Sequence, residues 1–223
     1  VKDFAEDKYV FMSTALGTVK KTPLSEFSRP RSNGIIAVNL DDGDHLIGVA
    51  ITDGQHNVML FSDEGKANRF DESEVRPMGR LARGVRGMKL GSGAQVISLL
   101  VAENEQQSVL TATENGFGKR TPVGEYRQTG RGTQGVIAIS TSARNGKVVA
   151  ATLVDPDDEV MLITTGGGTR SRHIYTIGLE MGMPTGVIAK FGSMVSEQNA
   201  LMIATLLSPW GGVKISHSDI VKL

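Results

Sequence analysis

The sequence predicts an all-β fold made of four copies of one blade, packed face to face as in a propeller. Two glycine landmarks recur along its 223 residues. The first ends a short apolar strand, at Gly17, Gly65, Gly116 and Gly167. The second precedes another apolar strand, at Gly34, Gly84, Gly135 and Gly186, with spacings of 50, 51 and 51 residues. Four short strands in about 50 residues are typical of a propeller blade.

Each repeat is expected to open with a β-hairpin, because two short strands flank a glycine turn. The second hairpin strands are predicted at 18–22, 66–70, 117–121 and 169–173. Third strands are predicted at 35–38, 85–88, 136–139 and 187–190, and fourth strands at 46–51, 96–101, 148–154 and 200–206. Since a blade cannot bury both faces alone, neighbouring blades must stack.

We therefore expect a single domain over residues 1–223. Its blades are predicted at about 8–54, 55–104, 105–156 and 157–207. The remaining segment, 208–223, is interpreted as a closing hairpin or as part of a further blade.

The composition excludes several classes of protein. The chain has no cysteine, which rules out a disulfide framework, a Cys-ligated zinc site and a thiol nucleophile. No window of 18 consecutive apolar residues is present, so no transmembrane helix is expected. The charged start of the chain does not resemble a signal peptide, and it is interpreted as a cut from something longer.

Charge is segregated although the net charge is zero. The stretches 17–34, 65–89, 116–135 and 166–190 hold 18 of the 24 Lys and Arg residues but only six of the 24 Asp and Glu residues. Equivalent positions of stacked blades fall on one surface, so the bases should form a belt around one edge. Such a belt suits a polyanion, and a curved basic edge would bend a DNA duplex.

The glycine-rich basic loops are the best candidate phosphate sites. Arginine offers a planar fork, and glycine lets backbone N–H groups approach. The strongest loop is 127–135, followed by 80–86 and 29–34, whereas 178–186 has no base. The alternative is that exposed turns are simply charged and rich in glycine. The predicted DNA-contacting residues are Lys20, Lys21, Arg29, Arg31, Lys66, Arg69, Arg76, Arg80, Arg83, Arg86, Lys119, Arg120, Arg127, Arg131, Arg170 and Arg172.

No catalytic or metal-binding pattern stands out. A phosphate-binding Walker loop, a zincin helix and a nucleophile elbow are all missing from the sequence. The four histidines are scattered. The acidic pairs Asp41/Asp42 and Asp157/Asp158 are interpreted as turns between blades. Tyr126 is expected in the core or between blades.

Several stretches resemble a known family, the C-terminal domain of the A subunit of bacterial DNA gyrase. They are 17–27, 58–66, 84–87 and 110–121, and the resemblance extends from residue 1 to about 165. The corresponding domain of topoisomerase IV is less similar in these stretches. The resemblance implies a β-pinwheel, a propeller-like disc whose blades exchange strands. It also implies that DNA wraps around the basic rim and is presented for ATP-dependent negative supercoiling by the holoenzyme.

The resemblance has further implications. The catalytic tyrosine, the metal-binding carboxylates and the ATPase lie in other regions of that family, so no activity and no cofactor are expected here; ATP and Mg are used elsewhere. The expected partners are double-stranded DNA and, in a heterotetramer, the gyrase B subunit with the rest of the A subunit. No membrane and no small-molecule substrate are expected, and the expected location is the bacterial cytoplasm, at the nucleoid.

The chain also departs from the family. The wrapping motif Gln-Arg-Arg-Gly-Gly-Lys-Gly is absent, and four blades with a remainder stand where the family usually has six. Two other functions stay open. One is a protein-interaction propeller whose basic rim binds an acidic partner. The other is a propeller enzyme, for which the sequence offers no convergent cluster of acids and histidines.

Overall fold

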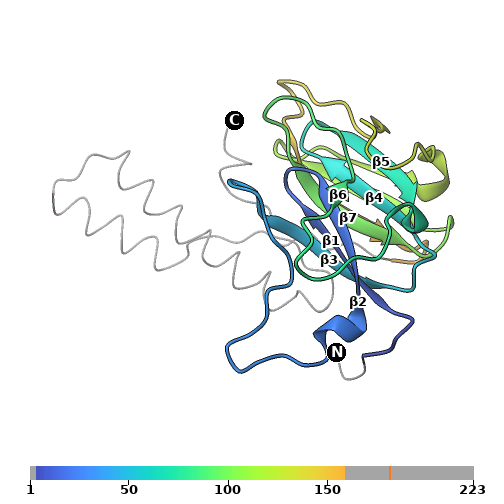
Figure 1. Ribbon diagram of the computed structural model, residues 1–223. Helices are drawn as coiled ribbons and strands as arrows, with labels where there is room; N and C mark the ends of the chain where they lie inside the picture. The colour runs from blue at the N-terminus through green and yellow to red at the C-terminus, as the bar shows by residue number, and fades with distance from the viewer. Residues whose placement is uncertain (1–3, 159–180, 182–223) are drawn as a thin grey trace. The chain divides into compact units, whose positions relative to one another are not determined.

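The computed structural model of the chain describes residues 4–158 and residue 181. These residues form an all-β assembly of short strands, which confirms the predicted fold class (Figure 1). The predicted fourth blade beyond residue 158, the segment 208–223, and both Arg170 and Arg172 lie outside the described residues. No helix in the described part is long and apolar enough to cross a membrane.

The described strands form three antiparallel sheets. The first sheet has the order β3 (Leu46–Thr52), β1 (Tyr9–Thr14), β2 (Thr18–Pro23) and β6 (Val85–Arg86). The second has the order β10 (Val136–Ile137), β5 (Lys66–Asp71), β4 (Asn57–Ser62) and β7 (Val96–Ala102). The third contains β11 (Val148–Val154), β8 (Ser108–Thr113) and β9 (Gly118–Pro122). A 3₁₀ helix follows each hairpin: η1 (Leu24–Phe27), η2 (Glu72–Glu74) and η3 (Val123–Glu125).

The outer strand of each four-stranded sheet comes from the next repeat. Strand β6 of the second repeat pairs with β2 of the first, and β10 of the third repeat pairs with β5 of the second. From the repeat pattern, β6 and β10 were expected to join the sheet of the repeat in which they lie in the sequence. This expectation is wrong, because each joins the sheet of the preceding repeat. Strand exchange, which the family resemblance implied, is confirmed. At the opposite edges of the sheets, β3 contacts β7, and β7 contacts β11. We therefore call β6 and β10, at the other edges, the rim strands.

The strand predicted at 35–38 is also wrong, since these residues form no strand. The strand exchange gives the physical reason. At this position in the later repeats, the chain pairs with the sheet of the preceding repeat. No sheet of a preceding repeat exists among residues 4–158, so the segment has no ladder to join.

Glycine is required at Gly17 and Gly65 for two reasons, the backbone conformation and the close approach of another segment. Both have a positive φ, of 83° and 80°. Their carbonyl oxygens also accept backbone hydrogen bonds from the chain that continues each rim strand, from Gly87 and Ala138. A Cβ atom would lie 2.7 Å from the Met88 oxygen at Gly17, and 2.1 Å from the Ile139 oxygen at Gly65. Glycine therefore permits both the turn and the close approach of the exchanged chain.

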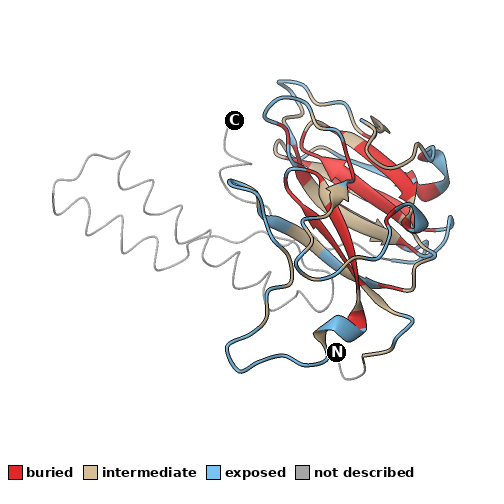
Figure 2. Ribbon diagram, in the orientation of Figure 1, coloured by how far each residue is buried: buried red, intermediate tan, exposed pale blue. Residues whose placement is uncertain are grey.

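The apolar cores lie between successive sheets (Figure 2). Phe11 and Val19 of the first sheet pack with Val58 and Leu60 of the second. Between the second and third sheets the core includes Met59, Phe61, Val109, Val123 and Tyr126. The Phe61 and Tyr126 rings meet edge to face with centroids 5.7 Å apart. The predicted core position of Tyr126 is confirmed.

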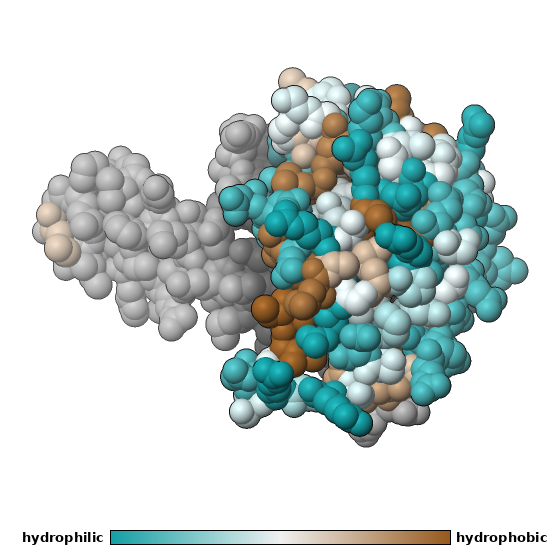
Figure 3. All heavy atoms as spheres, in the orientation of Figure 1, coloured by the Kyte–Doolittle hydropathy of each residue, from teal (hydrophilic) through white to brown (hydrophobic). Residues whose placement is uncertain are grey.

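The opposite face of the first sheet is less completely covered. Val49 and Ile51 of β3 are 55% and 51% exposed, although they pair across the ladder with the buried Met12 and Val10. Leu99, at the equivalent position of β7, instead packs against the first sheet at Gly48. Figure 3 shows separate apolar areas among mainly hydrophilic side chains on the face turned to the viewer.

Candidate nucleic-acid interface

The described candidate bases fall into three groups by exposure. The exposed ones are Arg29, Arg31, Arg76, Arg83, Arg86, Lys119, Arg120 and Arg127. The half-buried ones are Lys66, Arg80 and Arg131. The buried ones are Lys20, Lys21 and Arg69, which are 1%, 4% and 6% exposed. Only exposed or half-buried bases can reach a phosphate without rearrangement of the fold.

Lys20 holds two segments of backbone together. Its Nζ donates to the Ala37 carbonyl at 2.9 Å and to the Arg80 carbonyl. Burial lowers the pKa of the Lys20 ammonium, and the nearby Arg80 charge lowers it further. The predicted role of Lys20 in DNA contact is therefore corrected: the side chain faces the interior and is used by the fold.

Lys21 and Arg69 occupy equivalent positions in their hairpins and make equivalent contacts. Lys21 Nζ donates to the Glu72 carbonyl at 3.1 Å, and Arg69 NH1 donates to the Val123 carbonyl at 2.9 Å. Each acceptor is the first residue of the 3₁₀ helix in the following repeat. Both side chains therefore join neighbouring blades, and their assignment to DNA contact is corrected for the same reason as that of Lys20.

The exposed bases recur at equivalent places around the stack. Arg76 and Arg127 are 51 residues apart, and each follows shortly after a 3₁₀ helix. Arg86 lies on rim strand β6, and its backbone pairs with Thr18. These bases are exposed, as a basic belt requires, and their contact with DNA stays a prediction.

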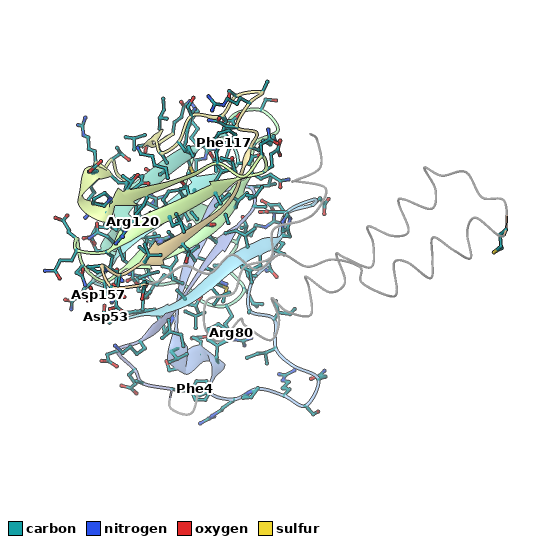
Figure 4. The ribbon with its side chains drawn as sticks, turned by 180° about the vertical axis from the view of Figure 1, so that it is seen from behind. Phe4, Asp53, Arg80, Phe117, Arg120 and Asp157 are labelled. Atoms are coloured by element: carbon teal, nitrogen blue, oxygen red, sulfur yellow. The ribbon has the colours of Figure 1, made fainter. Side chains whose placement is uncertain are left out.

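Other candidates are partly engaged within the protein. Arg83 forms an ion pair with Asp41, and Lys66 Nζ donates to Gln134 Oε1 at 3.5 Å. Arg120 NH2 donates to the Asp155 carbonyl at 3.3 Å. Figure 4 shows Arg80 and Arg120 in different parts of the domain.

One exposed base of the belt was not among the predicted DNA-contacting residues. Lys89 follows rim strand β6 and is exposed. Its backbone N–H donates to the Thr133 carbonyl at 2.8 Å, which places it beside loop 127–135. Because Lys89 lies inside the basic stretch 65–89, the sequence already indicated that it belongs with the other bases of the belt.

A cluster at the first blade boundary has the residue types of a metal site. Ligand-type atoms of Asp53, His56 and Glu72 lie within 4.8 Å of one another. However, Lys21 Nζ lies 3.7 Å from Glu72 Oε1, and Thr52 Oγ1 donates to the same oxygen at 2.5 Å. Because an ammonium group already faces the buried carboxylate, we assign the cluster to the joining of blades.

The Asp53 carboxylate completes this network at the surface. Its Oδ1 lies 2.7 Å from His56 Nδ1, and it accepts from the backbone N–H of Gln55 at 3.1 Å. The Gln55 hydrogen bond and the neighbouring His56 hold the pKa of Asp53 below its usual value.

Both acidic pairs lie in turns, as predicted, but the turn at Asp41/Asp42 lies within the first repeat, before β3, and not between repeats. The Asp44 N–H donates to the Asp41 carbonyl at 3.0 Å, and the Asp158 N–H donates to the Asp155 carbonyl at 3.2 Å.

Comparison with known proteins places the chain in a family. The family described as DNA gyrase C-terminal domain, beta-propeller, matches residues 8–53, 56–103 and 107–155. The DNA gyrase A subunit of Pseudomonas aeruginosa is 60% identical over 204 residues, covering 92% of this chain and 22% of that protein. The gyrase A subunit of Escherichia coli K12 is 52% identical over 181 residues, covering 80% of this chain and 21% of that protein.

Solved structures agree with this placement. The C-terminal domain of DNA gyrase A superposes with a TM-score of 0.65 at 30% identity, covering 74% of this chain and 55% of that one. The C-terminal domain of DNA topoisomerase IV superposes with a TM-score of 0.66 at 29% identity, covering 70% of this chain and 49% of that one. The chain spans about a fifth of the length of its curated relatives. With its repeats, exchanged strands and sequence all in agreement, the chain belongs to the DNA gyrase C-terminal domain family.

Proposed function

We propose that this chain is a non-catalytic DNA-binding domain of the gyrase A subunit, and that its basic rim bends and wraps a segment of duplex. The observation that carries the proposal is the recurrence of exposed arginines at equivalent positions, Arg76 and Arg127. Arg86 and Lys89 add two exposed bases on and beside rim strand β6. Cations that recur from blade to blade suit a polyanion such as DNA, whose phosphates recur along the duplex.

Such contacts favour binding without base readout. Arginine and lysine bound to phosphate fix the path of the duplex but carry no sequence information. Each neutralised phosphate releases condensed counterions, so affinity falls as salt rises. A rim that contacts phosphates on successive blades offsets the energy needed to bend the duplex.

The wrapped segment would be presented to the rest of gyrase for ATP-dependent negative supercoiling. In this proposal, DNA cleavage, ATP and Mg belong to other regions of the holoenzyme. The protein partners are the gyrase B subunit and the remainder of the A subunit, in a heterotetramer. A role on the chromosome places the protein in the bacterial cytoplasm.

The test removes the recurrent arginines from the full 223-residue chain. The double variant Arg76→Gln/Arg127→Gln should bind duplex DNA more weakly at low salt. Its slope of log affinity against log salt should be shallower by about 1.8, since each phosphate contact contributes roughly 0.9. Arg144→Gln is the control, because Arg144 is exposed but lies outside the basic stretches, stacked 4.9 Å above the Phe117 ring. An unchanged slope in the double variant would show that Arg76 and Arg127 do not contact phosphates.

A further inference from the structure

Two arginines of the basic loops make the same contact with the preceding repeat. Arg80 NH1 donates to the Ile36 carbonyl at 2.9 Å. Arg131 NH1 donates to the Arg86 carbonyl at 2.7 Å. The two arginines are 51 residues apart, and each acceptor is the second residue after a landmark glycine. The contact is therefore a repeated feature of the fold.

A glutamate residue of the preceding repeat lies beside the Nε atom of each arginine. Glu26 Oε2 lies 4.0 Å from Arg80 Nε. Arg131 Nε donates to the Glu74 carbonyl at 3.3 Å, and Glu74 Oε2 accepts from the Arg131 backbone N–H at 2.8 Å. Both glutamates are the third residue of a 3₁₀ helix. Each arginine thus joins the 3₁₀ helix of one repeat to the chain that follows its second landmark glycine.

A buried polar side chain donates hydrogen bonds to the backbone on both sides of each arginine contact. In the first repeat it is Lys20, which donates to the Ala37 and Arg80 carbonyls. The equivalent residue of the second repeat is Asn68, whose Nδ2 donates to the Gly87 carbonyl at 2.9 Å and to the Gly130 carbonyl at 3.2 Å. The backbone that carries Arg80 and Arg131 is therefore held rigidly against the preceding repeat.

We propose that Arg80 and Arg131 are positioning residues, which fix the spacing between consecutive rim segments and so set the curvature along which DNA bends. The inference rests on the proposed DNA-binding function. An arginine that binds phosphate presents its planar fork outward. In these two residues NH1 is bonded to a backbone carbonyl, and Nε faces a glutamate of the preceding repeat.

The two joints differ in how much they depend on the arginine. We define the first joint as segments 36–41 and 80–83, and the second as 86–89 and 131–133. The second joint also has two backbone bonds, from Gly132 to the Gly87 carbonyl at 2.7 Å and from Lys89 to the Thr133 carbonyl at 2.8 Å. Both segments of the first joint are described by the structure, and no backbone bond links them. There Asn39 Nδ2 donates to the Leu81 carbonyl at 2.7 Å, and Arg83 forms an exposed ion pair with Asp41. Loss of Arg80 should therefore change the curvature more than loss of Arg131.

The experiment measures affinity and bending separately in the full chain. A duplex with a donor and an acceptor dye at its two ends reports bending by energy transfer at saturating protein, and a salt titration counts phosphate contacts. Arg131→Gln should lower the energy transfer and leave the salt slope within about 0.3 of the wild-type value, well under the roughly 0.9 of one contact. Arg80→Gln should lower the energy transfer further. Arg127→Gln gives the comparison for the loss of one phosphate contact and should lower the slope by about 0.9. Arg144→Gln is the control, which should leave both the slope and the energy transfer unchanged.

A second variant removes the partner and keeps the arginine. Glu74→Ala removes the side chain whose Oε2 accepts from the Arg131 backbone N–H, and it deletes no base. A positioning role predicts reduced energy transfer for this variant, together with an unchanged midpoint of thermal unfolding. If Glu74→Ala bends DNA like the wild type, the proposal is wrong. If Arg131→Gln lowers the slope by about 0.9 at unchanged transfer, Arg131 is a phosphate contact and the proposal is also wrong. Absence of DNA binding by the wild-type chain would overturn the proposed function instead.

Discussion

The ammonium group of Lys21 reaches from the first hairpin to Glu72, the first residue of the 3₁₀ helix in the next repeat. It donates to the Glu72 backbone carbonyl at 3.1 Å and lies 3.7 Å from the side-chain carboxylate. The Glu72 side chain is completely buried. A buried ion pair thus joins two successive repeats, and this joint can be tested directly.

Replacement of Lys21 by methionine should lower the free energy of unfolding by about 3 kcal/mol, because the Glu72 carboxylate is then left buried without its cation. The double variant Lys21→Met/Glu72→Leu should recover most of that loss. The next repeat supports this expectation, since Val123 occupies the position equivalent to Glu72. Urea denaturation of the two variants provides the measurement. A double variant as unstable as the single one would show that the pair is not the cause.

Replacement of Asn68 by alanine should lower the free energy of unfolding by about 3 kcal/mol, since it leaves several buried polar groups unpaired. The amide donates two hydrogen bonds, and its Oδ1 accepts from the hydroxyls of Thr129 at 2.6 Å and Thr133 at 2.9 Å. Asn39→Ala is the control, because Asn39 is exposed and its amide donates to Leu81 alone. That control should lose about 1 kcal/mol or less. Equal losses in the two variants would argue against a special role for Asn68.

Substitution of hairpin glycines should separate backbone strain from close packing. Gly65 and Gly116 have similar φ values of 80° and 79°. A Cβ atom at Gly65 would lie 2.1 Å from the Ile139 oxygen, whereas nothing lies within 4 Å at Gly116. Both alanine variants carry the strain of a positive φ, about 1–2 kcal/mol. Gly65→Ala must in addition displace the exchanged chain, so its midpoint of thermal unfolding should fall well below that of Gly116→Ala. Similar midpoints would contradict the close approach.

The stability of the domain should fall in acid, below the usual aspartate pKa of 3.8, through the carboxylate of Asp71. Its Oδ1 accepts from the Ser73 N–H at 2.8 Å, and the side-chain and backbone hydrogen bonds of Ser73 hold the pKa of Asp71 below its usual value of 3.8. The Asp71 carboxyl therefore takes up a proton at higher pH in the unfolded chain than in the folded chain. Its contribution to the free energy of unfolding is complete above the unfolded-state pKa and is lost as pH falls through the folded-state pKa.

The Asp71→Asn variant tests this pH dependence. The variant should be less stable than the wild type near neutral pH, and the difference should shrink as pH falls below the usual aspartate value of 3.8. Urea denaturation over a pH series provides the measurement. A difference that stays constant with pH would show that the ionisation of Asp71 does not contribute.

The hairpins could be predicted because their signal is local. A run of apolar residues, a turn at Gly65 and a second short strand predict β4 and β5 without reference to the rest of the chain. The partner of Val85 and Arg86 could not be predicted from the repeat alone. A two-residue strand carries no pattern that says whether it joins its own sheet or the preceding one, and it joins the preceding one.

The DNA-contacting residues stay a prediction, and the structure shows only which of them are exposed. Arg76 and Arg127 are exposed as expected. Lys20, Lys21 and Arg69 are buried, because backbone carbonyls at the blade boundaries accept their hydrogen bonds. Residue type indicates a cation, but the positions of these carbonyls depend on how successive sheets stack, and sequence spacing does not give that geometry.

The most direct test of a DNA-wrapping rim is a salt titration of the full chain with two duplexes, of about 20 and about 100 base pairs, or roughly two and ten helical turns. Contacts spread over successive blades predict tighter binding to the long duplex and a steeper salt slope, as more phosphates are engaged. Weak binding that is independent of length, with a shallow slope, would contradict DNA wrapping and favour an acidic protein partner for the rim.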